Sequence, residues 1–408
     1  MILQFLVRQI TVYASVIGLS LFVGRKADPQ EYALFNLINA FFGMSYILCD
    51  FGFGKSAIRS RLFASDVLLR IASRVNFILG AVFGTVVYLT LAKYAKFSAA
   101  PEVICLFIVA SGLSLGSFYR MESSQRFDLI GRAEILQVII YVSSFFLTFL
   151  ISNNAVISII VSSVLRSFSI PFSYKVFNKN VTTTDTNTNN SNVQEIKISR
   201  VLGLFADGFQ YQLSQLLFIS KDIVLLYILS SNITRTQQGF IAMAQTYSLL
   251  PILFIGPLSR VLLPRFSKKF DERNDAKPVI TLSLVLLFAS VIFSYLLYVS
   301  FPLFDMYAFN DKYADSYRIV KILVLVNIFT LPSIPIVSFL SVLLGYRAYL
   351  AYSILCVGVT WIVALVFPIY KIEDYLVPML SGHAVNLLVV LAFYFSPKIK
   401  SLKGNYVA

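Results

Sequence analysis

The chain has 408 residues and a formal net charge of +14, and 58% of its residues are hydrophobic while only 13% are charged. Soluble domains are typically about 45–50% apolar and about 25% charged. The composition therefore excludes an ordinary soluble domain and predicts an all-α integral membrane protein.

The scarcity of reactive side chains excludes several kinds of site. His383 is the only histidine, and Cys49, Cys105 and Cys356 lie scattered in or beside apolar runs. A histidine-based catalytic or metal cluster is thus excluded, and the cysteines form neither a disulfide framework nor a metal site. We expect no catalytic residue, no metal and no cofactor. The excess of Lys and Arg lies mainly in loops, as membrane topology requires, which argues against a nucleic-acid partner.

Continuous apolar stretches predict about twelve transmembrane helices, because about 20 apolar residues are needed to cross the hydrocarbon core. In chain order the predicted spans are 3–23, 32–49, 75–94, 103–118, 135–151, 156–177, 201–229, 240–263, 279–301, 319–344, 349–367 and 375–395. The fourth and fifth of these runs are shorter than the others and fall below the length that is needed to cross the hydrocarbon core. Lys and Arg concentrate in alternate loops, and this asymmetry places both termini in the cytoplasm.

One polar tract divides the chain. Residues 178–198 contain the run VTTTDTNTNNSN, which cannot bury a core and is typical of a flexible linker. We predict an N-terminal six-helix bundle at 1–177, this cytoplasmic linker, a C-terminal six-helix bundle at 199–397 and a cytoplasmic tail at 398–408. Such a six-plus-six arrangement suits a transporter whose halves rock around a shared site.

The stretch 199–230 is apolar enough to span a membrane, yet polar residues recur along it at helical spacing. They are Asp207, Gln210, Tyr211, Ser214, Lys221 and Asp222. Lipid does not accommodate such a stripe, so it must face a bundle interior or a watery cavity. We interpret it as one wall of a polar path.

The residues 21–61, LFVGRKADPQEYALFNLINAFFGMSYILCDFGFGKSAIRSR, carry a resemblance to a known family. They resemble the opening of polysaccharide flippases of the MATE-like superfamily, the Wzx or O-antigen transporter type, whose patterns read R-x-L-G-P-x-x-Y-G-x-F and then D-x-G-x-x-x-A-x-x-R. The matching residues are Arg25, Pro29, Tyr32 and Phe35, followed by Asp50, Gly52, Ala57 and, slightly shifted, Arg59. Later stretches, KDIVLLYILSSNITRTQQGFIAMAQTYSLL and PLSRVLLPRFSKKFDE, are similar to the family's second half.

The chain also departs from this family pattern. Ala27 and Asp28 replace the usual Leu-Gly pair or its neighbours, Ala33 replaces a common Gly, and Lys221 precedes Asp222 where an uncharged residue is usual. These departures bear on the substrate more than on the family.

The resemblance implies two six-helix bundles around a central cavity. It also implies export of an undecaprenyl-diphosphate-linked oligosaccharide, such as an O-antigen repeat unit, from the cytoplasmic to the periplasmic face of a bacterial inner membrane. The implied partners are that lipid-linked sugar, the bilayer, a coupling cation (proton or sodium), a polysaccharide polymerase and glycosyltransferases.

A diphosphate and a sugar need a polar, cationic path, because an unpaired charge in hydrocarbon is very costly. Arginine suits phosphate because it is always charged and binds two oxygens at once. The candidate substrate-binding residues are Arg8, Arg166, Lys221, Gln210 and Tyr211. We expect Arg166 near mid-bilayer, where it either lines the cavity or forms a purely structural ion pair. Arg8 either binds substrate or extends its side chain to the lipid headgroups. Lys321 lies near the end of its span and is interpreted as interfacial.

The remaining candidates concern coupling and gating. Asp207 and Asp222 either carry a proton, because burial raises a carboxyl pKa, or neutralise cavity cations. Arg25, Asp50, Arg59 and Arg265 are candidate gating or loop residues, and Asp50 could instead cap its helix. Arg59 and Arg265 fall at the same offset in two similar 33-residue stretches, 34–66 and 240–272.

Two other functions stay open. A small-molecule exporter of the same superfamily would favour a cavity of acids and apolar groups, against which the cations at membrane depth argue. A polymerase or ligase acting on the same lipid would carry a sizeable outside loop with catalytic Arg or His. Here those loops are short and His383 stands alone within a span, either as a buried structural residue or as a proton carrier. We therefore expect a transporter and not an enzyme.

Overall fold

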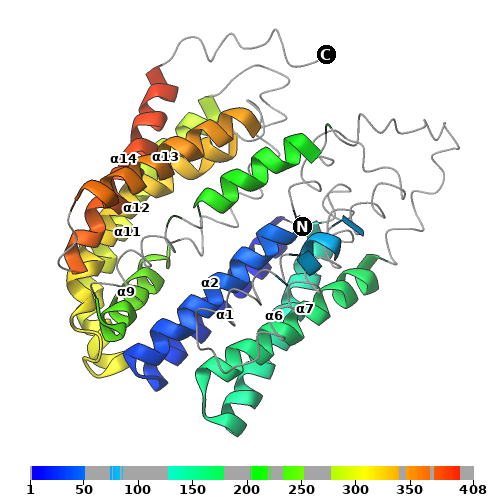
Figure 1. Ribbon diagram of the computed structural model, residues 1–408. Helices are drawn as coiled ribbons and strands as arrows, with labels where there is room; N and C mark the ends of the chain where they lie inside the picture. The colour runs from blue at the N-terminus through cyan, green and yellow to red at the C-terminus, as the bar shows by residue number, and fades with distance from the viewer. Residues whose placement is uncertain are drawn as a thin grey trace, which may run out of the picture. The chain divides into compact units, whose positions relative to one another are not determined.

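The structure is a computed structural model that describes residues 2–50, 127–178, 205–218, 233–251, 277–339, 346–367 and 372–395, with isolated residues at 74, 75, 77–82, 85, 203 and 221. All regular elements in these residues are helices (Figure 1). They include α1 (Ile2–Lys26), α2 (Pro29–Asp50), α6 (Phe127–Ser152), α7 (Ala155–Asn178), α9 (Arg235–Ser248), α11 (Lys277–Phe309), α12 (Ser316–Phe339), α13 (Tyr346–Val366), the short 3-10 helix η3 (Ile372–Tyr375) and α14 (Leu376–Phe395). Residues 205–218 are also helical.

Five of the described helices are long and apolar enough to cross a membrane, which confirms the predicted all-α integral membrane class. These spans are Leu6–Lys26, Asp128–Ser152, Ile280–Phe309, Ser316–Pro335 and Tyr346–Val366. The fifth predicted span was drawn too short, because the polar first turns of α6 also belong to the helix, which begins at Phe127 and not at residue 135. The predicted span 103–118 lies outside the described residues.

The chain folds into two compact units. The first unit contains Met1–Leu19 and Leu34–Leu216, and the second contains Ser20–Ala33 and Leu217–Ala408. Apart from Asn178, which ends α7, the predicted linker 178–198 lies outside the described residues, so its role as a boundary stays a prediction.

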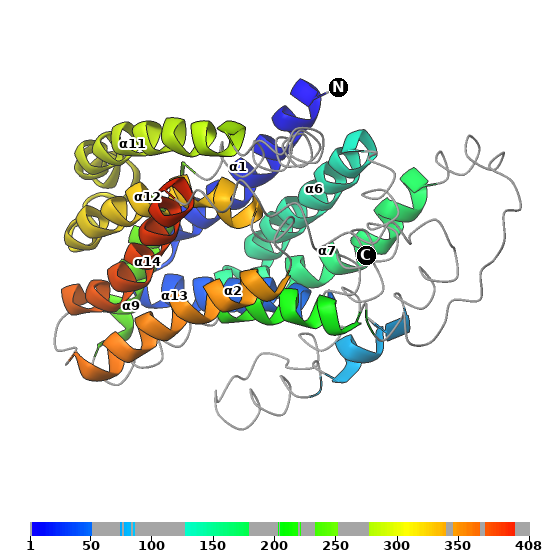
Figure 2. The same cartoon turned by 90° about the horizontal axis from the view of Figure 1, so that it is seen from above.

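In the first unit, α6 and α7 form an antiparallel hairpin and run side by side (Figure 2). Asn153 adopts a left-handed φ of 49°, which asparagine tolerates at the end of a helix. The side chain of Asn154 then accepts a hydrogen bond from the backbone N–H of Ile157 and starts α7. The buried face of α7 is rich in serine. Four of these hydroxyl groups donate hydrogen bonds to backbone carbonyls three or four residues earlier, those of Ser158, Ser162, Ser167 and Ser173. Small, self-satisfied side chains allow close helix packing in lipid.

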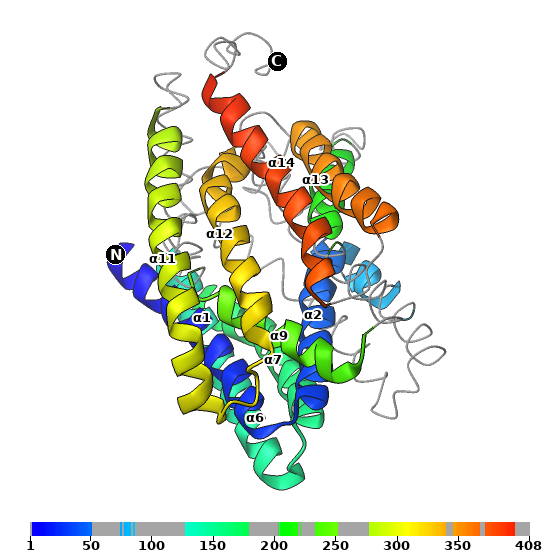
Figure 3. The same ribbon diagram turned by 90° about the vertical axis from the view of Figure 1, so that its left-hand side faces the viewer.

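In the second unit, α11, α12, α13 and α14 lie alongside one another (Figure 3). α11 has 33 residues and is about 50 Å long at 1.5 Å per residue, so it extends past a hydrocarbon core of about 30 Å. Beyond its end the chain turns through Asn310 and Asp311, whose φ angles are 55° and 61°. The carboxylate of Asp305 fastens this turn by accepting the backbone N–H of Tyr313 at 3.1 Å.

The turn between α1 and α2 belongs to the second unit, where it packs against α9. The two backbones approach closely at Gly239, because a Cβ atom added there would collide with the backbone oxygen of Pro29. Tyr32 is fully buried beside this contact, and its hydroxyl bonds both Ser20 and Thr246 at 3.0 and 2.9 Å. A glycine is therefore required at position 239 of α9.

We expect Gly239→Ala to lower the melting temperature in detergent, because the added methyl group forces the α1–α2 turn away from α9. Overpacking of this kind costs about 1–3 kcal/mol. The matched control is Gly18→Ala in α1, where an added Cβ meets no atom within 4 Å. The control should be neutral or more stable, because alanine favours a helix by about 0.5–1 kcal/mol. Equal melting temperatures for the two variants would contradict the close approach.

Candidate functional site

Arg166 lies eleven residues into α7, about 16 Å from the start of this 24-residue helix. Its guanidinium carbon lies 5.3 Å from the ring centroid of Tyr141 on α6, within the range of a cation–π interaction. The Tyr141 hydroxyl is held in turn by a hydrogen bond with Ser163. Among the described residues no ion pair or hydrogen bond engages the guanidinium, and its Nε is buried without a partner. The ring orients the cation without neutralising it.

Arg8 on α1 contacts α6, the helix that also carries the aromatic partner of Arg166. It is half-buried, and one terminal nitrogen donates to the backbone oxygen of Asp128 at 3.0 Å. The next residue, Gln9, is buried and bonds the carboxylate of Glu134, which fixes α1 against α6. Asp128 and Tyr141 are thirteen residues apart, or about 20 Å along α6. Two guanidinium groups of the first unit thus mark positions about 20 Å apart along one helix.

The residues of the predicted polar stripe differ in their burial. Asp207 is exposed and Tyr211 is half-buried, whereas Ser214 is fully buried and donates to the backbone oxygen of Gln210. Within the described part of the chain, Gln210 keeps a buried Oε1 without a hydrogen-bond partner, and so does the Nε2 of Gln212, a buried residue outside the predicted stripe. The Gln210 and Gln212 side chains therefore offer one free acceptor and one free donor.

Lys221 lies inside the second unit, only 6% exposed, with its Nζ 3.3 Å from Nε2 of His383 on α14. The other ring nitrogen of His383 contacts Thr330 of α12 at 2.8 Å and Asn386 of α14 at 3.2 Å. From the sequence we expected Lys221 on a cavity wall and His383 alone in a span, and the contact between them was not predicted. The sequence did contain one indication of a polar cluster here, because His383 and Asn386 are three residues apart and therefore lie on one face of a helix.

Tyr352 and Cys356 of α13 complete this cluster, since both donate to the Oδ1 of Asn386. They lie four residues apart and therefore on one face of α13. Neither was a sequence candidate. The cluster thus contains hydroxyl, thiol, amide, imidazole and amine groups drawn from α12, α13, α14 and Lys221.

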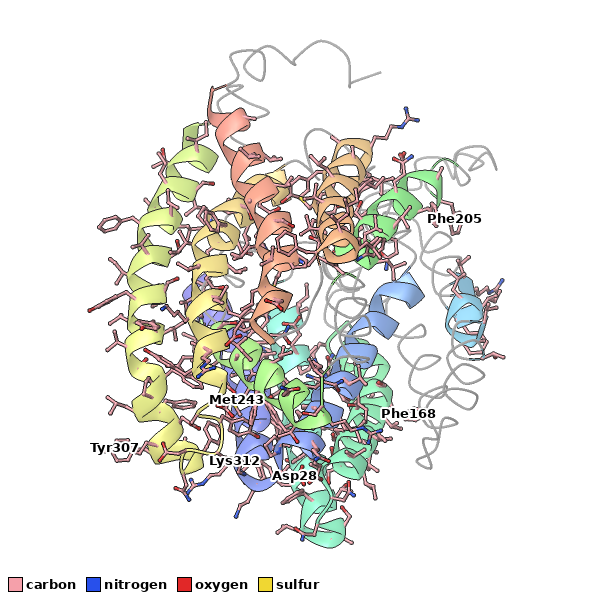
Figure 4. The ribbon with its side chains drawn as sticks, turned by 60° about the vertical axis from the view of Figure 1, so that its left-hand side comes forward. Asp28, Phe168, Phe205, Met243, Tyr307 and Lys312 are labelled. Carbon is pink, nitrogen blue, oxygen red and sulfur yellow. The ribbon has the colours of Figure 1, made fainter. Side chains whose placement is uncertain are left out.

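A second cluster surrounds the α1–α2 turn, where Asp28, Met243 and Lys312 lie near one another (Figure 4). Arg25 of this turn is exposed. Lys312 follows α11 and donates to three backbone oxygens of this turn, those of Gly24, Arg25 and Ala27, at 3.3, 2.8 and 2.9 Å. The last carbonyls of a helix have no partner within the helix, so Lys312 caps α1. Burial lowers the pKa of Lys312, and the carboxylates of Asp28 and Asp305 oppose that shift.

Tyr313 supports the same cap. Its buried hydroxyl donates to the backbone oxygen of Gly24 at 3.0 Å, and burial raises its pKa above the usual value for tyrosine. A Cβ added at Gly24 would meet the terminal methyl group of Met243, which would have to move aside. The α1–α2 turn is therefore held by both side-chain hydrogen bonds and close packing.

The side chains of the remaining residues predicted from the sequence are not described by the structure. Asp222, Arg59 and Arg265 lie outside the described residues, and Asp50 ends α2 with only its backbone described. Among the described residues, no group of three or more His, Cys, Asp or Glu side chains could hold a metal ion.

Solved structures place this geometry in a known fold. An outward-facing multidrug resistance MATE family transporter of the MOP superfamily is similar over 96% of this chain and 94% of its own, with a TM-score of 0.68 and 13% identity. An inward-facing conformation of such a transporter is similar over 94% and 93%, with a TM-score of 0.60 and 14% identity.

A MOP superfamily transporter from Pyrococcus furiosus, described as having a binding pocket of reverse polarity that suggests a different function, is similar over 96% and 94%. Its TM-score is 0.69 and its identity 13%. No protein-family model and no curated protein sequence matches the chain. The chain therefore has a MATE-type fold.

We expect Lys312→Met to loosen the end of α1, because three carbonyl oxygens lose their donor. Hydrogen bonds to charged groups are worth about 1.5–3 kcal/mol, so local opening should rise about 10–100-fold. Hydrogen–deuterium exchange of a peptide covering 20–33 would show this as faster exchange at Ala27 and Tyr32, whose amides bond Val23 and Asp28.

The matched control for this exchange measurement is Lys26→Met, which removes an exposed lysine from the last turn of α1. It should leave exchange in this peptide unchanged. If both lysine variants exchange at the wild-type rate, Lys312 does not cap α1.

Proposed function

We propose that the chain is a flippase for undecaprenyl-diphosphate-linked oligosaccharide, which moves the sugar headgroup from the cytoplasmic to the periplasmic face of a bacterial inner membrane. Both termini would then be cytoplasmic. The MATE-type fold supports a transporter and not an enzyme. The flippase-like patterns in residues 21–61 support the lipid-linked sugar as substrate.

The observation that carries this proposal is the environment of the Arg166 guanidinium. A charged side chain at mid-membrane depth is costly, and it is normally paired. Here the Tyr141 ring orients the cation, and no carboxylate among the described residues pairs with it. A diphosphate would supply the missing negative charge, because its oxygens accept two parallel hydrogen bonds from one guanidinium.

Arg8 extends the same argument along α6. Its contact at Asp128 lies about 20 Å from that of Arg166 at Tyr141, measured along the helix. We assign Arg8 the first contact with the diphosphate and Arg166 the contact at mid-span. The free Oε1 of Gln210 and the neighbouring Tyr211 are suited to sugar hydroxyls, which both donate and accept hydrogen bonds.

A second candidate is a small-molecule exporter, favoured by the description of structural neighbours as multidrug resistance transporters. An unpaired guanidinium repels cationic drugs, so this function predicts anionic or neutral cargo. The two functions differ in the outcome of one comparison. Purified protein in liposomes should translocate a fluorescent polyprenyl-diphosphate oligosaccharide, and not anionic or neutral drugs, if the flippase proposal is correct.

We expect Arg166→Ala to reduce translocation of this lipid about 10–100-fold, because one charge-assisted contact is worth about 1.5–3 kcal/mol. Arg166→Lys should be intermediate, since lysine keeps the charge and loses the two-pronged geometry. The matched control is Arg318→Ala. Arg318 is 75% exposed and forms a surface pair with Glu373, so its loss should leave translocation unchanged.

Both alanine variants must insert into the membrane at wild-type levels for this comparison. Full translocation by Arg166→Ala would remove Arg166 from the mechanism. Translocation of drugs, and none of the lipid-linked sugar by the wild type, would replace the flippase with the exporter.

A further inference from the structure

The second unit contains a buried basic pair that the proposed lipid transport does not use. The Nζ of Lys221 and the Nε2 of His383 lie 3.3 Å apart, and the two residues are 6% and 8% exposed. Two buried cations at this distance would repel each other strongly. The pair can therefore hold one positive charge, but not two.

One arrangement of hydrogens places that charge on Lys221. Thr330 donates its hydroxyl hydrogen to the backbone oxygen of Val326 at 2.9 Å, which leaves the hydroxyl oxygen as an acceptor. The Nδ1 of His383, 2.8 Å away, then carries a hydrogen and donates it to Thr330. The opposite nitrogen, Nε2, is bare and accepts from the Lys221 ammonium.

A second arrangement has one proton fewer, and in it the Thr330 hydroxyl turns its hydrogen from the Val326 oxygen to the Nδ1 of His383. The side-chain nitrogen of Asn386 lies 3.2 Å from Nδ1 and can only donate, so Nδ1 is bare and accepts from it. The ring hydrogen then lies on Nε2 and is donated to a neutral Lys221 amine. The Oδ1 of Asn386 meanwhile accepts from Tyr352 and Cys356, which holds the amide in this orientation. In the charged arrangement the amide turns over, so that its oxygen accepts from Nδ1.

We propose that Lys221 and His383 form a proton-binding site that couples proton movement to transport. In the step that releases a proton, an Nζ–H bond of Lys221 breaks and an Nε2–H bond of His383 forms. The Nδ1–H bond of His383 breaks at the same time, and that proton passes to water. The charged pair thus becomes a neutral pair, one proton leaves, and no oxidant or reductant is involved.

The chemistry of the pair favours a proton over a sodium ion. Hard cations such as Ca²⁺ and Mg²⁺ bind through oxygen ligands, and Na⁺ is likewise a hard cation. This pair presents two basic nitrogens, one of which carries the charge itself. The sequence left proton and sodium open as coupling ions, and the contact between Lys221 and His383 supports the proton.

Lys221 has further contacts besides His383, and the described titratable and polar groups around the pair come from α12, α13 and α14. α13 contributes the titratable Tyr349, Tyr352 and Cys356, with Tyr349 and Tyr352 both packed against Phe218. α12 contributes the hydroxyls of Thr330 and Ser333, and α14 contributes Asn386. Asp222, next to Lys221 in sequence, lies outside the described residues.

His383 is the only histidine, so full-length protein labelled with ¹⁵N-histidine and reconstituted in lipid nanodiscs gives one imidazole signal. We expect the hydrogen to lie on Nδ1 at low pH and on Nε2 at high pH, with a one-proton transition between them. Lys221→Met should abolish this transition. The matched control is Lys321→Met, which removes an exposed lysine from α12 and should leave the transition unchanged.

A single tautomer from pH 5 to pH 9 in the wild type would overturn the site, and so would an unchanged transition in Lys221→Met. If Lys221→Met does not fold, the wild-type titration alone decides between these outcomes. Because this measurement needs no substrate, it is independent of the proposed function, on which only the coupling rests.

Coupling is tested with the fluorescent lipid-linked oligosaccharide in liposomes that carry a pH gradient. We expect the gradient to accelerate wild-type translocation, and His383→Gln to translocate at the same rate with and without the gradient. Wild-type translocation that ignores the gradient would overturn the coupling while leaving the flippase proposal intact. Absence of lipid translocation, together with the expected tautomer transition, would retain the proton site and reject the flippase.

Discussion

The structure depends on one constraint, which is that hydrocarbon offers no hydrogen-bond partner to a polar group. The buried serines of α7 meet it by bonding carbonyls of their own helix, as Ser167 does with Ser163. Gln137 of α6 meets it by donating to Ser173 of α7. The guanidinium of Arg166 differs from these satisfied groups, because no described residue pairs with it. Burying an unpaired charge costs free energy, so the charge at this position calls for a functional explanation.

The α1–α2 turn shows the same constraint at the end of a span. A helix that stops leaves carbonyls without donors, and here Lys312 supplies all three of its N–H bonds to them. The chain passes from the first unit to the second at this turn and back again, and it crosses once more at Leu216–Leu217. Within the second unit this turn is held by hydrogen bonds from Lys312 and Tyr313 and by the close approach of Pro29 to Gly239.

The sequence predicted the class of the fold because apolar length and loop charge act through the bilayer, whose thickness is known. It placed α7 within one residue at each end, since its prediction of 156–177 compares with Ala155–Asn178. It drew α6 too short because hydropathy does not register a helix that continues into polar residues such as Asp128 and Arg132. Propensity and capping, which decide such ends, are local and weak.

Side-chain partners were harder to predict, because they depend on which residues distant in sequence are brought together. Arg166 and Lys221 look alike in a sequence, as single cations within apolar runs. The fold gives Arg166 an aromatic face, which preserves its charge and leaves its hydrogens free of any described partner. It gives Lys221 a second base, 162 residues away, which limits the two residues to one shared charge. The first environment suits a group that binds an anion, and the second suits a group that gains and loses a proton, which is why we propose different roles for two similar cations.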